Sequence, residues 1–348
     1  MTFDPKCPVP LASEVIQLAH GGGGRTSWKL LHDVVLPALG ASPGDASLDA
    51  AVLSLPAEGG RLAFTTDASI VRPLFFPGGD IGTLAVYGSV NDLAAVGARP
   101  LALSLSLVIE EGLPLDTLRR VLGSIARASE RAGVRVVTGD TKVVDRGRGD
   151  GIYTSVAGVG IVPAGVDLSP KRIRPGDAIV VTGDVGRHGV AILSVREGLA
   201  FESPVESDCA PVTPLVEALL GAGVELHALR DPTRGGLAAA LNELCLDAGV
   251  AMTVREQDVP VSEPVRAACE LLGLDPFAMA CEGRLVVFVA SAHAERAVAV
   301  LHAHPLGASA AVIGGVEDSP AGRVTLTTRL GTRRALDFLT GEALPRIC

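Results

Sequence analysis

Five aspartates stand beside glycines or small polar residues at intervals along the chain, and their carboxylates could bind a hard metal ion. They are Asp67, Asp80, Asp92, Asp140 and Asp231. Several follow apolar, strand-like stretches, so we expect them in turns where their carboxylates emerge at the ends of a sheet. Converging carboxylates suit Mg²⁺, which prefers oxygen ligands and often binds through substrate phosphates. Aspartate also forms turns and caps helices, so each residue alone leaves a purely structural alternative open.

Three other side chains have the chemistry to move protons or to carry a covalent group. The chain has only four lysines among its 30 basic residues, and Lys142 lies in an aspartate-rich segment, which favours a proton-transfer role that arginine cannot fill. Glu282 precedes an apolar run and is a candidate base. Cys348 is the last residue of a segment with no periodicity, which we expect to move. A solvated surface lysine and a glutamate in a surface turn remain the alternatives for the first two.

Two common site motifs are absent from the sequence. The glycine-rich stretch 20–27 lacks the GxxxxGK[ST] spacing of a phosphate-binding loop, so it is either a flexible linker or a flap over phosphates. The six cysteines form no CxxC pair, which argues against a zinc or dithiol site.

The composition indicates a globular, cytoplasmic protein. Of the 348 residues, 48% are apolar, and the formal net charge is −9 without a basic patch, so we expect no nucleic-acid partner. The N-terminus has no apolar signal core, and no apolar run is long enough to span a membrane.

Strand-like and helix-like segments alternate, which predicts an α/β (α+β) protein with mixed sheets and helices packed on them. The expected strands are 61–66, 103–109, 135–138, 152–161, 178–182, 284–290, 311–316 and 324–328. The expected helices are 115–132, capped by Asp116, and 214–220, 236–248, 263–272 and 294–303.

A proline-rich break at 163–176 divides the chain. We expect an N-terminal segment with the glycine-rich loop at 1–37, a first domain at 38–165, a second α/β domain at 176–336 and a mobile tail at 337–348.

Several of these segments, taken together, resemble the hydrogenase maturation factor HypE, within the superfamily of aminoimidazole ribonucleotide synthetase and selenophosphate synthetase. They are 65–67, 73–92 (PLFFPGGDIGTLAVYGSVND), 139–150 (GDTKVVDRGRGD), 188–199, 231–237 (DPTRGGL) and 344–348. The final Pro345-Arg346-Ile347-Cys348 is the most specific of these, because it follows the other motifs in the expected order.

The resemblance implies the two-domain fold of that superfamily and a homodimer joined through strands of the N-terminal domains. It also implies that the N-terminal domain binds Mg-ATP through its acidic turns. We expect Mg²⁺ ligands at Asp67, Asp92 and Asp231. The expected ATP contacts are Gly78, Gly79, Asp80, Asn91, Asp140 and Thr141.

The resemblance further implies a reaction on the terminal thiol. A carbamoyltransferase partner, HypF, would load Cys348 with a carbamoyl group, and ATP would activate the amide oxygen for dehydration. Glu282 would act as the base and Lys142 would assist. The resulting cyano group would pass to iron on a HypC–HypD scaffold, to supply a [NiFe]-hydrogenase. We expect Arg346 to favour the thiolate of Cys348.

The sequence departs from the family pattern at two places: Cys281 stands where the family usually has Asn, and the segment before His20 is longer. Three alternatives were weighed. A selenophosphate synthetase would need an N-terminal reactive residue, for which Cys7 is the only candidate. A thiamine phosphate kinase fits the fold but gives Cys348 no purpose. A non-catalytic carrier would only display Cys348 to partners, and ATP hydrolysis that depends on carbamoylation would exclude it.

Overall fold

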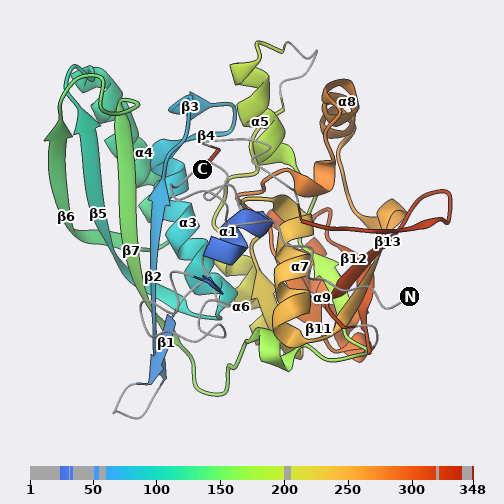
Figure 1. Ribbon diagram of the computed structural model, residues 1–348. Coiled ribbons are helices and arrows are strands. Elements are labelled where there is room, and N and C mark those ends of the chain that lie inside the picture. The colour runs from blue at the N-terminus through green and yellow to red at the C-terminus, as the bar shows by residue number, and fades with distance from the viewer. Residues whose placement is uncertain are drawn as a thin grey trace.

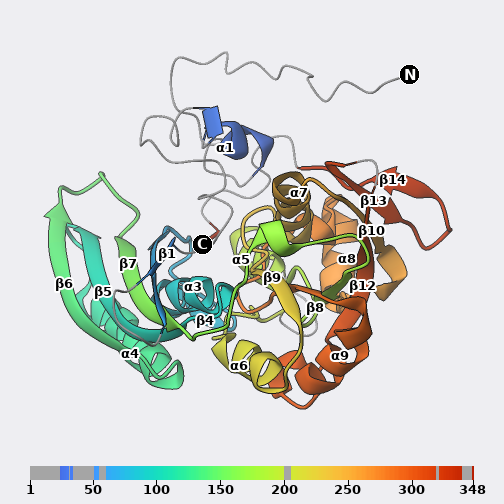
Figure 2. The same cartoon turned by 90° about the horizontal axis from the view of Figure 1, so that it is seen from below.

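The structure is a computed structural model that describes residues 24–30, 32–33, 51–54, 60–199, 205–318, 321–338 and 347–348. Two sheets lie side by side, each with its own helices, and the chain ends between them (Figures 1 and 2). The predicted two-domain fold with mixed sheets is therefore confirmed. In the described ranges, no helix combines the length and apolar character that a membrane crossing needs.

The N-terminal sheet has the strand order β1-β2-β7-β5-β6. Its strands are β1 Ala51–Ser54, β2 Arg61–Ser69, β5 Arg99–Glu110, β6 Arg135–Val144 and β7 Ile152–Val162. Only β5 and β6 pair in parallel, and the helix α4, Leu115–Arg131, connects them. A small hairpin of β3 (Phe75–Phe76) and β4 (Gly79–Asp80) stands before helix α3, Ile81–Ala95.

Helix α3 is buried on almost all sides, with 13 of its 15 residues out of solvent. It therefore has no polar stripe, and the periodicity that marks a surface helix is missing. Asp80 caps the helix, since its carboxylate accepts from the N–H groups of Gly82 and Thr83 at 2.8 and 3.0 Å. Asn91 and Asp92 thus lie inside a helix rather than in a turn.

The turn assignment was also wrong for two other aspartates. Asp67 lies within β2 and Asp140 within β6, because both strands extend beyond their predicted ends. Asp116 does not cap α4: Pro114 occupies the cap position without a side-chain bond, and Asp116 instead pairs with Arg119 at 2.8 Å.

The C-terminal sheet has the order β14-β13-β10-β12-β8-β11-β9. Its strands are β8 Ala178–Val181, β9 Leu226–Arg230, β10 Ala251–Arg255, β11 Val286–Val289, β12 Ala311–Glu317, β13 Arg323–Thr327 and β14 Arg333–Ala335. Its helices are α5 Arg187–Arg196, α6 Thr213–Gly221, α7 Gly236–Ala248, α8 Glu263–Leu272 and α9 Ala294–His302. The segments α5, β9, β10 and β14 were not among the predicted elements. A short helix, α1 Arg25–Leu30, precedes both sheets in the chain.

The neighbouring strands β8 and β11 are buried on both faces, as their runs of Val, Ile and Phe require. Successive side chains point to opposite faces. Val180 and Val287 pack with α6 and α9, whereas Ile179 and Phe288 pack with α7. The segment 163–177, which includes a short 3₁₀ turn at Pro170–Arg172, runs between the two sheets.

Candidate functional site

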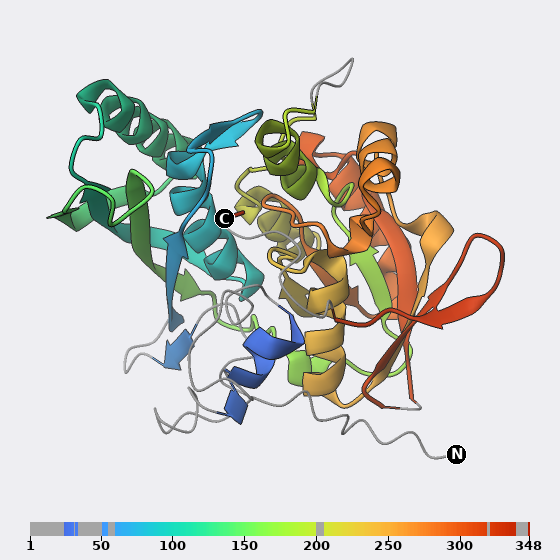
Figure 3. The same ribbon diagram turned by 45° about the horizontal axis from the view of Figure 1, so that its top comes forward.

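The last two residues of the chain lie between the two domains, near α3 and α5 (Figure 3). Ile347 is 4% exposed and packs with Val71 of the N-terminal domain and Ile192 of α5. Its carbonyl is 2.6 Å from Nε2 of His188, and the N–H of Ile70 donates to the main-chain oxygen of Cys348 at 3.1 Å. The chain end is therefore docked by side-chain and main-chain contacts.

The docked Cys348 side chain lies beside the Glu282 carboxyl group, close enough for that carboxyl group to affect the thiol. Burial, followed by the charges of Glu282 and Asp67, raises the pKa of the Cys348 thiol, and Arg234 opposes the shift without cancelling it. In this docked position the raised pKa favours the thiol over the thiolate, and the expectation that Arg346 favours the thiolate stays a prediction. Arg346 lies outside the described residues.

Glu282 is held rigidly by its main chain. The N–H groups of Glu282 and Gly283 both donate to Oδ2 of Asp208 at 3.2 Å, and the Glu282 carbonyl accepts from the amide of Asn91 at 3.1 Å. Position 283 requires glycine, because a Cβ there would come within 1.9 Å of the Asp208 carbonyl oxygen. The turn thus fixes the direction in which the carboxyl group points.

The Glu282 side chain is 6% exposed, and its Oε1 has no hydrogen-bond partner among the described residues. Burial is the main reason why the pKa of Glu282 is raised well above its ordinary value, and the charges of Asp67, Asp231 and Asp208 add to it. A carboxyl group in this state holds a proton until a cation or a substrate compensates its charge. Raised pKa values of this kind are typical of groups that transfer protons.

Asp67 of β2 and Asp231, just after β9, bring carboxylates from both domains to the same site. Burial raises the pKa of each, and the negative charge of Asp67 raises that of Asp231 further. Within the described ranges, no three acidic, His or Cys side chains already form a metal-binding group. Asp67 and Asp231 nevertheless lie close enough for the charge of the first to raise the pKa of the second. Such a pair of carboxylates fits a hard cation whose other ligands come from phosphates.

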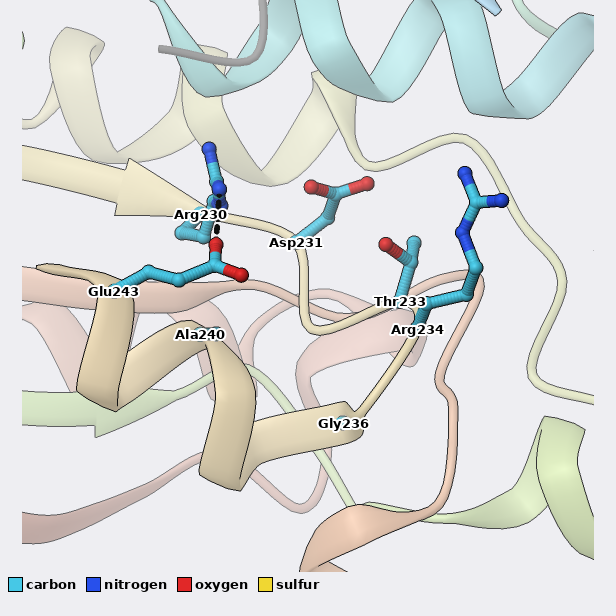
Figure 4. Close-up of a pocket in the computed structure, with 7 residues that line it drawn as sticks. All are labelled: Arg230, Asp231, Thr233, Arg234, Gly236, Ala240 and Glu243. Carbon is cyan, nitrogen blue, oxygen red and sulfur yellow. Dashed lines mark hydrogen bonds and ion pairs between the residues drawn. The ribbon is translucent and has the colours of Figure 1, made fainter. Parts of the chain in front are cut away.

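A pocket of about 160 Å³ opens beside these groups at the start of α7 (Figure 4). Its lining residues are Arg230, Asp231, Thr233, Arg234, Gly236, Ala240 and Glu243. Arg230 and Glu243 neutralise each other in a 2.5 Å ion pair, whereas Asp231 and Arg234 point away from α7 toward α3. The pocket therefore offers one carboxyl group and one guanidinium cation to a polar ligand.

The other predicted metal ligand, Asp92, accepts a 2.7 Å hydrogen bond from Oγ1 of Thr65. Asn91 joins the domains: its Nδ2 donates to the carbonyls of Ala210 and Glu282 at 3.0 and 3.1 Å, and its Oδ1 accepts from Val212 at 2.9 Å. The Asn91 amide is thus occupied by protein main chain, and it helps to position Glu282.

The glycine-rich turn before α3 packs tightly against protein. Gly78 has a φ of +85°, and a Cβ there would lie 2.6 Å from the N atom of Ser207. A Cβ at Gly79 would lie 2.8 Å from the Phe76 ring. These glycines and the capping Asp80 therefore have structural roles here, and their contacts with ATP stay predictions.

Lys142 and Asp140 do not lie at this site. They pair with each other on the edge strand β6, with N–O distances of 2.9 and 2.6 Å, and both side chains are exposed. Figures 1 and 2 show β6 on the far side of its sheet from the chain end. Nothing is described of the Thr141 side chain. Within one subunit the structure groups Cys348, Glu282, Asp67 and Asp231, but not Lys142.

Sequence reasoning missed three residues of the site: Arg234, Asp208 and His188. Arg234 belongs to the DPTRGGL segment and had a detectable signal, whereas Asp208 and His188 gain their roles only through contacts across the fold. The atypical Cys281 is fully buried, and its sulfur accepts from the N–H of Gly186 at 3.2 Å, so it serves packing.

Comparison with known proteins shows where this arrangement recurs. The AIR synthase related protein, N-terminal domain family matches residues 47–162, and the corresponding C-terminal domain family matches residues 174–327. Carbamoyl dehydratase HypE of Azotobacter vinelandii is 48% identical over 96% of this chain and 97% of its own length. HypE of Rhizobium leguminosarum bv. viciae is 47% identical over 99% and 98%.

Solved structures agree. A HypE in complex with ATP has a TM-score of 0.81 at 45% identity, covering 96% of this chain and 100% of that one. The HypE–HypF complex has a TM-score of 0.83 at 42% identity, covering 89% and 99%. A thiamine monophosphate kinase from Aquifex aeolicus, at 21% identity, 87% and 97% coverage and a TM-score of 0.64, shares the fold alone. By sequence over nearly its whole length and by structure, the chain belongs to the HypE carbamoyl dehydratases of the AIR synthase-related family.

Proposed function

We propose that this chain uses ATP to dehydrate a carbamoyl group carried on Cys348 to a thiol-bound cyano group. The observation that carries the proposal is the Cys348 sulfur docked against the buried Glu282, beside Asp67 and Asp231. The relatives are named for this activity, and a HypE with 45% identity to this chain was solved with ATP. A carbamoyl group on the sulfur would lie next to the Glu282 carboxyl.

The chemistry must remove an amide oxygen, which is a poor leaving group. Phosphoryl transfer from ATP to that oxygen releases ADP and turns the oxygen into part of a phosphate ester. Loss of both N–H protons and departure of phosphate then leave the S–C≡N group. The net change is S-carbamoyl plus ATP to S-cyano plus ADP and phosphate, so the elements of water leave within the phosphate.

Glu282 fits the role of base in this sequence. Its raised pKa brings a carboxyl group closer to the operating pH, which is where a general base is most efficient. Its main chain is fixed by Asp208 and Asn91, so the carboxyl group needs no large rearrangement to reach an adduct on the neighbouring sulfur. Arg234 lies close enough to oppose the acidic charge and to bind a phosphate oxygen.

Mg²⁺ fits the pair Asp67 and Asp231, because burial raises the pKa of both and a bound cation would compensate the cost of their buried charges. Magnesium would supply charge neutralisation for the phosphates at this position. Asp92, bonded to Thr65, lies behind them as a third candidate ligand. ATP itself would contact the N-terminal domain, with Gly78, Gly79, Asp80, Asp140 and Thr141 as the remaining predicted contacts.

The protonated, docked thiol indicates that loading takes place elsewhere. A thiolate is the nucleophilic form of cysteine, and the docked pKa disfavours it. The tail would therefore carry Cys348 out to a carbamoyltransferase partner such as HypF, return it to Glu282 and then present the cyano group to a HypC–HypD iron scaffold. A tethered arm performs these visits at high effective concentration without releasing the intermediate.

We further propose a homodimer through the outer face of the N-terminal sheet. The helices α3 and α4 pack on the inner face, whereas Phe64 of β2 is 44% exposed and Leu101 of β5 is 55% exposed. On β6, Val137 is 58% exposed. A second copy would bury this apolar face, and it would bring Lys142 toward the site of the other subunit.

Intact-mass measurement tests the reaction itself. Protein carbamoylated on Cys348 should lose one water when Mg-ATP is added, while Cys348→Ala should acquire no adduct. Cys209→Ala is the matched control, because its thiol is also close to Glu282 yet has no proposed chemistry. An adduct on any cysteine other than Cys348 would contradict the proposal.

No observation favours the selenophosphate synthetase alternative. Its required thiol, Cys7, lies outside the described residues, and the relatives that cover nearly the whole chain bear the other name.

A further inference from the structure

His188 of α5 is a fully buried histidine that the proposed chemistry does not use. Its Nε2 lies 2.6 Å from the carbonyl oxygen of Ile347, and its Nδ1 lies 2.9 Å from Oγ of Ser207. The ring packs edge-on against Phe76, with centroids 5.3 Å apart. The buried imidazole therefore connects Ser207, in the protein interior, to the main chain of the last residues.

These contacts fix the tautomer of the ring. A carbonyl oxygen can only accept, so Nε2 carries the proton and donates to Ile347. Nδ1 then accepts from the hydroxyl of Ser207, whose oxygen in turn accepts from the N–H of Cys209 at 3.1 Å. Burial lowers the pKa of His188, as does Arg196, while the bond to Ile347 and the charge of Asp208 act in the opposite direction. The neutral ring therefore has both nitrogens satisfied only while the tail is docked.

We infer that His188 is a positioning residue that latches the C-terminal tail in the site and so sets the balance between docked and released Cys348. Its partner carbonyl is separated from Cys348 by one peptide bond. When the tail leaves, the Nε2–H loses its acceptor in a pocket formed by apolar side chains. A buried donor left without a partner is unfavourable, so the imidazole favours the docked state.

The other docking contacts differ from this latch. Ile347 fills an apolar space that many side chains could fill, and the bond from Ile70 to Cys348 uses main chain only. Among the described side chains, His188 is the one that donates to the main chain of residues 347–348. Its replacement can therefore release the tail without altering Glu282, Asp67 or Asp231. The purpose of the latch rests on the proposed function, but its existence does not.

Alkylation of Cys348 measures tail release without any catalytic assay. Nucleotide-free, full-length protein is treated with iodoacetamide, and the modification of each cysteine is followed by peptide mass spectrometry. Cys348 is half-buried in the docked tail, so His188→Leu, which releases the tail, should increase the Cys348 labelling rate by about ten-fold. Cys245, Cys269 and Cys281, each no more than 1% exposed, should stay protected and show that the fold is intact.

A matched control and a rescue sharpen the result. His302 also bonds a main-chain carbonyl, that of Ala310 at 2.9 Å, but it ends α9 and makes no contact with the chain end, so His302→Leu should leave Cys348 labelling unchanged. His188→Gln keeps a donor at the reach of Nε2 and should restore slow labelling, whereas the shorter His188→Asn should not.

The outcomes separate cleanly. An unchanged Cys348 rate in His188→Leu, with the three buried cysteines protected, overturns the latch. If that variant instead exposes the buried cysteines, the comparison of His188→Asn with His188→Gln decides, and equal labelling in those two overturns it. Failure of dehydration with intact latching would contradict the proposed function alone.

Discussion

At the scale of single residues, the defining feature of the site is the group of acidic side chains around the Cys348 sulfur. Burial raises the pKa of Glu282, Asp67 and Asp231; the charges of Asp67 and Asp231 raise that of Glu282 further, and Arg234 opposes the shifts of Glu282 and Asp67. Such a cluster destabilises the ligand-free protein. It becomes favourable when a metal ion, bound together with phosphates, balances the negative charge of the acidic groups. Of Glu282, Asp67 and Asp231, Glu282 is the most buried and should show this effect most clearly.

Replacing Glu282 with glutamine should stabilise the ligand-free protein while stopping dehydration. The folded-state pKa of Glu282 is raised, so its stabilising contribution is present below the unfolded pKa of about 4.3 and is lost as the pH rises toward the folded value. The neutral glutamine amide does not ionise, so the variant does not lose this stability as the pH rises. Relative to wild type, Glu282→Gln should gain on the order of 1–3 kcal/mol in urea unfolding at about pH 8, and less at about pH 5.

Glu225 provides the opposite case. Its hydrogen bond to His227 lowers its pKa, so the carboxylate stabilises the fold above its unfolded pKa. Glu225→Gln should therefore lower the urea midpoint at the higher pH. If Glu282→Gln lost stability there in the same way, the assignment of a strained, proton-holding carboxyl group would be wrong.

At the scale of elements, the short turn before β11 determines where Glu282 points. Asp208 holds its N–H groups, and Asn91 of the buried α3 holds its carbonyl. The turn thus receives support from both domains. A substitution that prevents the tight packing of this turn against Asp208 should displace the Glu282 carboxyl group, even though it removes no catalytic side chain.

Gly283→Ala tests this support. The added Cβ would come within 1.9 Å of the Asp208 carbonyl oxygen, which is main chain and cannot rotate away. We expect a loss of about 1–3 kcal/mol in the free energy of unfolding, together with strongly reduced dehydration. Gly221→Ala is the control, because a Cβ at this end of α6 meets nothing within 4 Å. Equal stability of the two variants would show that the turn is adaptable.

At the scale of the whole molecule, the position of Lys142 matters most. Its pairing with Asp140 on the exposed strand β6 leaves it remote from Cys348 in the same subunit. A role for Lys142 in proton transfer therefore depends on the proposed dimer. The two halves of the site would then come from different chains.

Mixed dimers can test this arrangement. Cys348→Ala protein and Lys142→Met protein should each be inactive, whereas unfolding and refolding them together should restore activity. In the mixed dimer, one site combines an intact Cys348 with the intact Lys142 of the other chain. Continued inactivity of the mixture would place Lys142 in its own subunit's chemistry or outside the reaction, and Lys171→Met serves as the control for a surface lysine.

Local pattern was enough to predict much of this protein. The apolar runs of β8 and β11 and the striped helix α4 follow from periodicity, because burial on two faces or on one leaves a distinct local pattern. The terminal Cys348 and the turn with Glu282 were identified from residue type and motif. Those inferences need only neighbours in sequence.

The tertiary structure decided what neighbours in sequence cannot. Helix α3 has no stripe because protein surrounds it, so Asn91 and Asp92 were wrongly placed in a turn. His188 meets Ile347 across 159 positions of sequence, and the convergence of Asp67 with Asp231 requires both domains. Proximity between distant residues arises from packing, and burial then changes their pKa values; that is why the docked thiol is protonated and why Lys142 lies elsewhere.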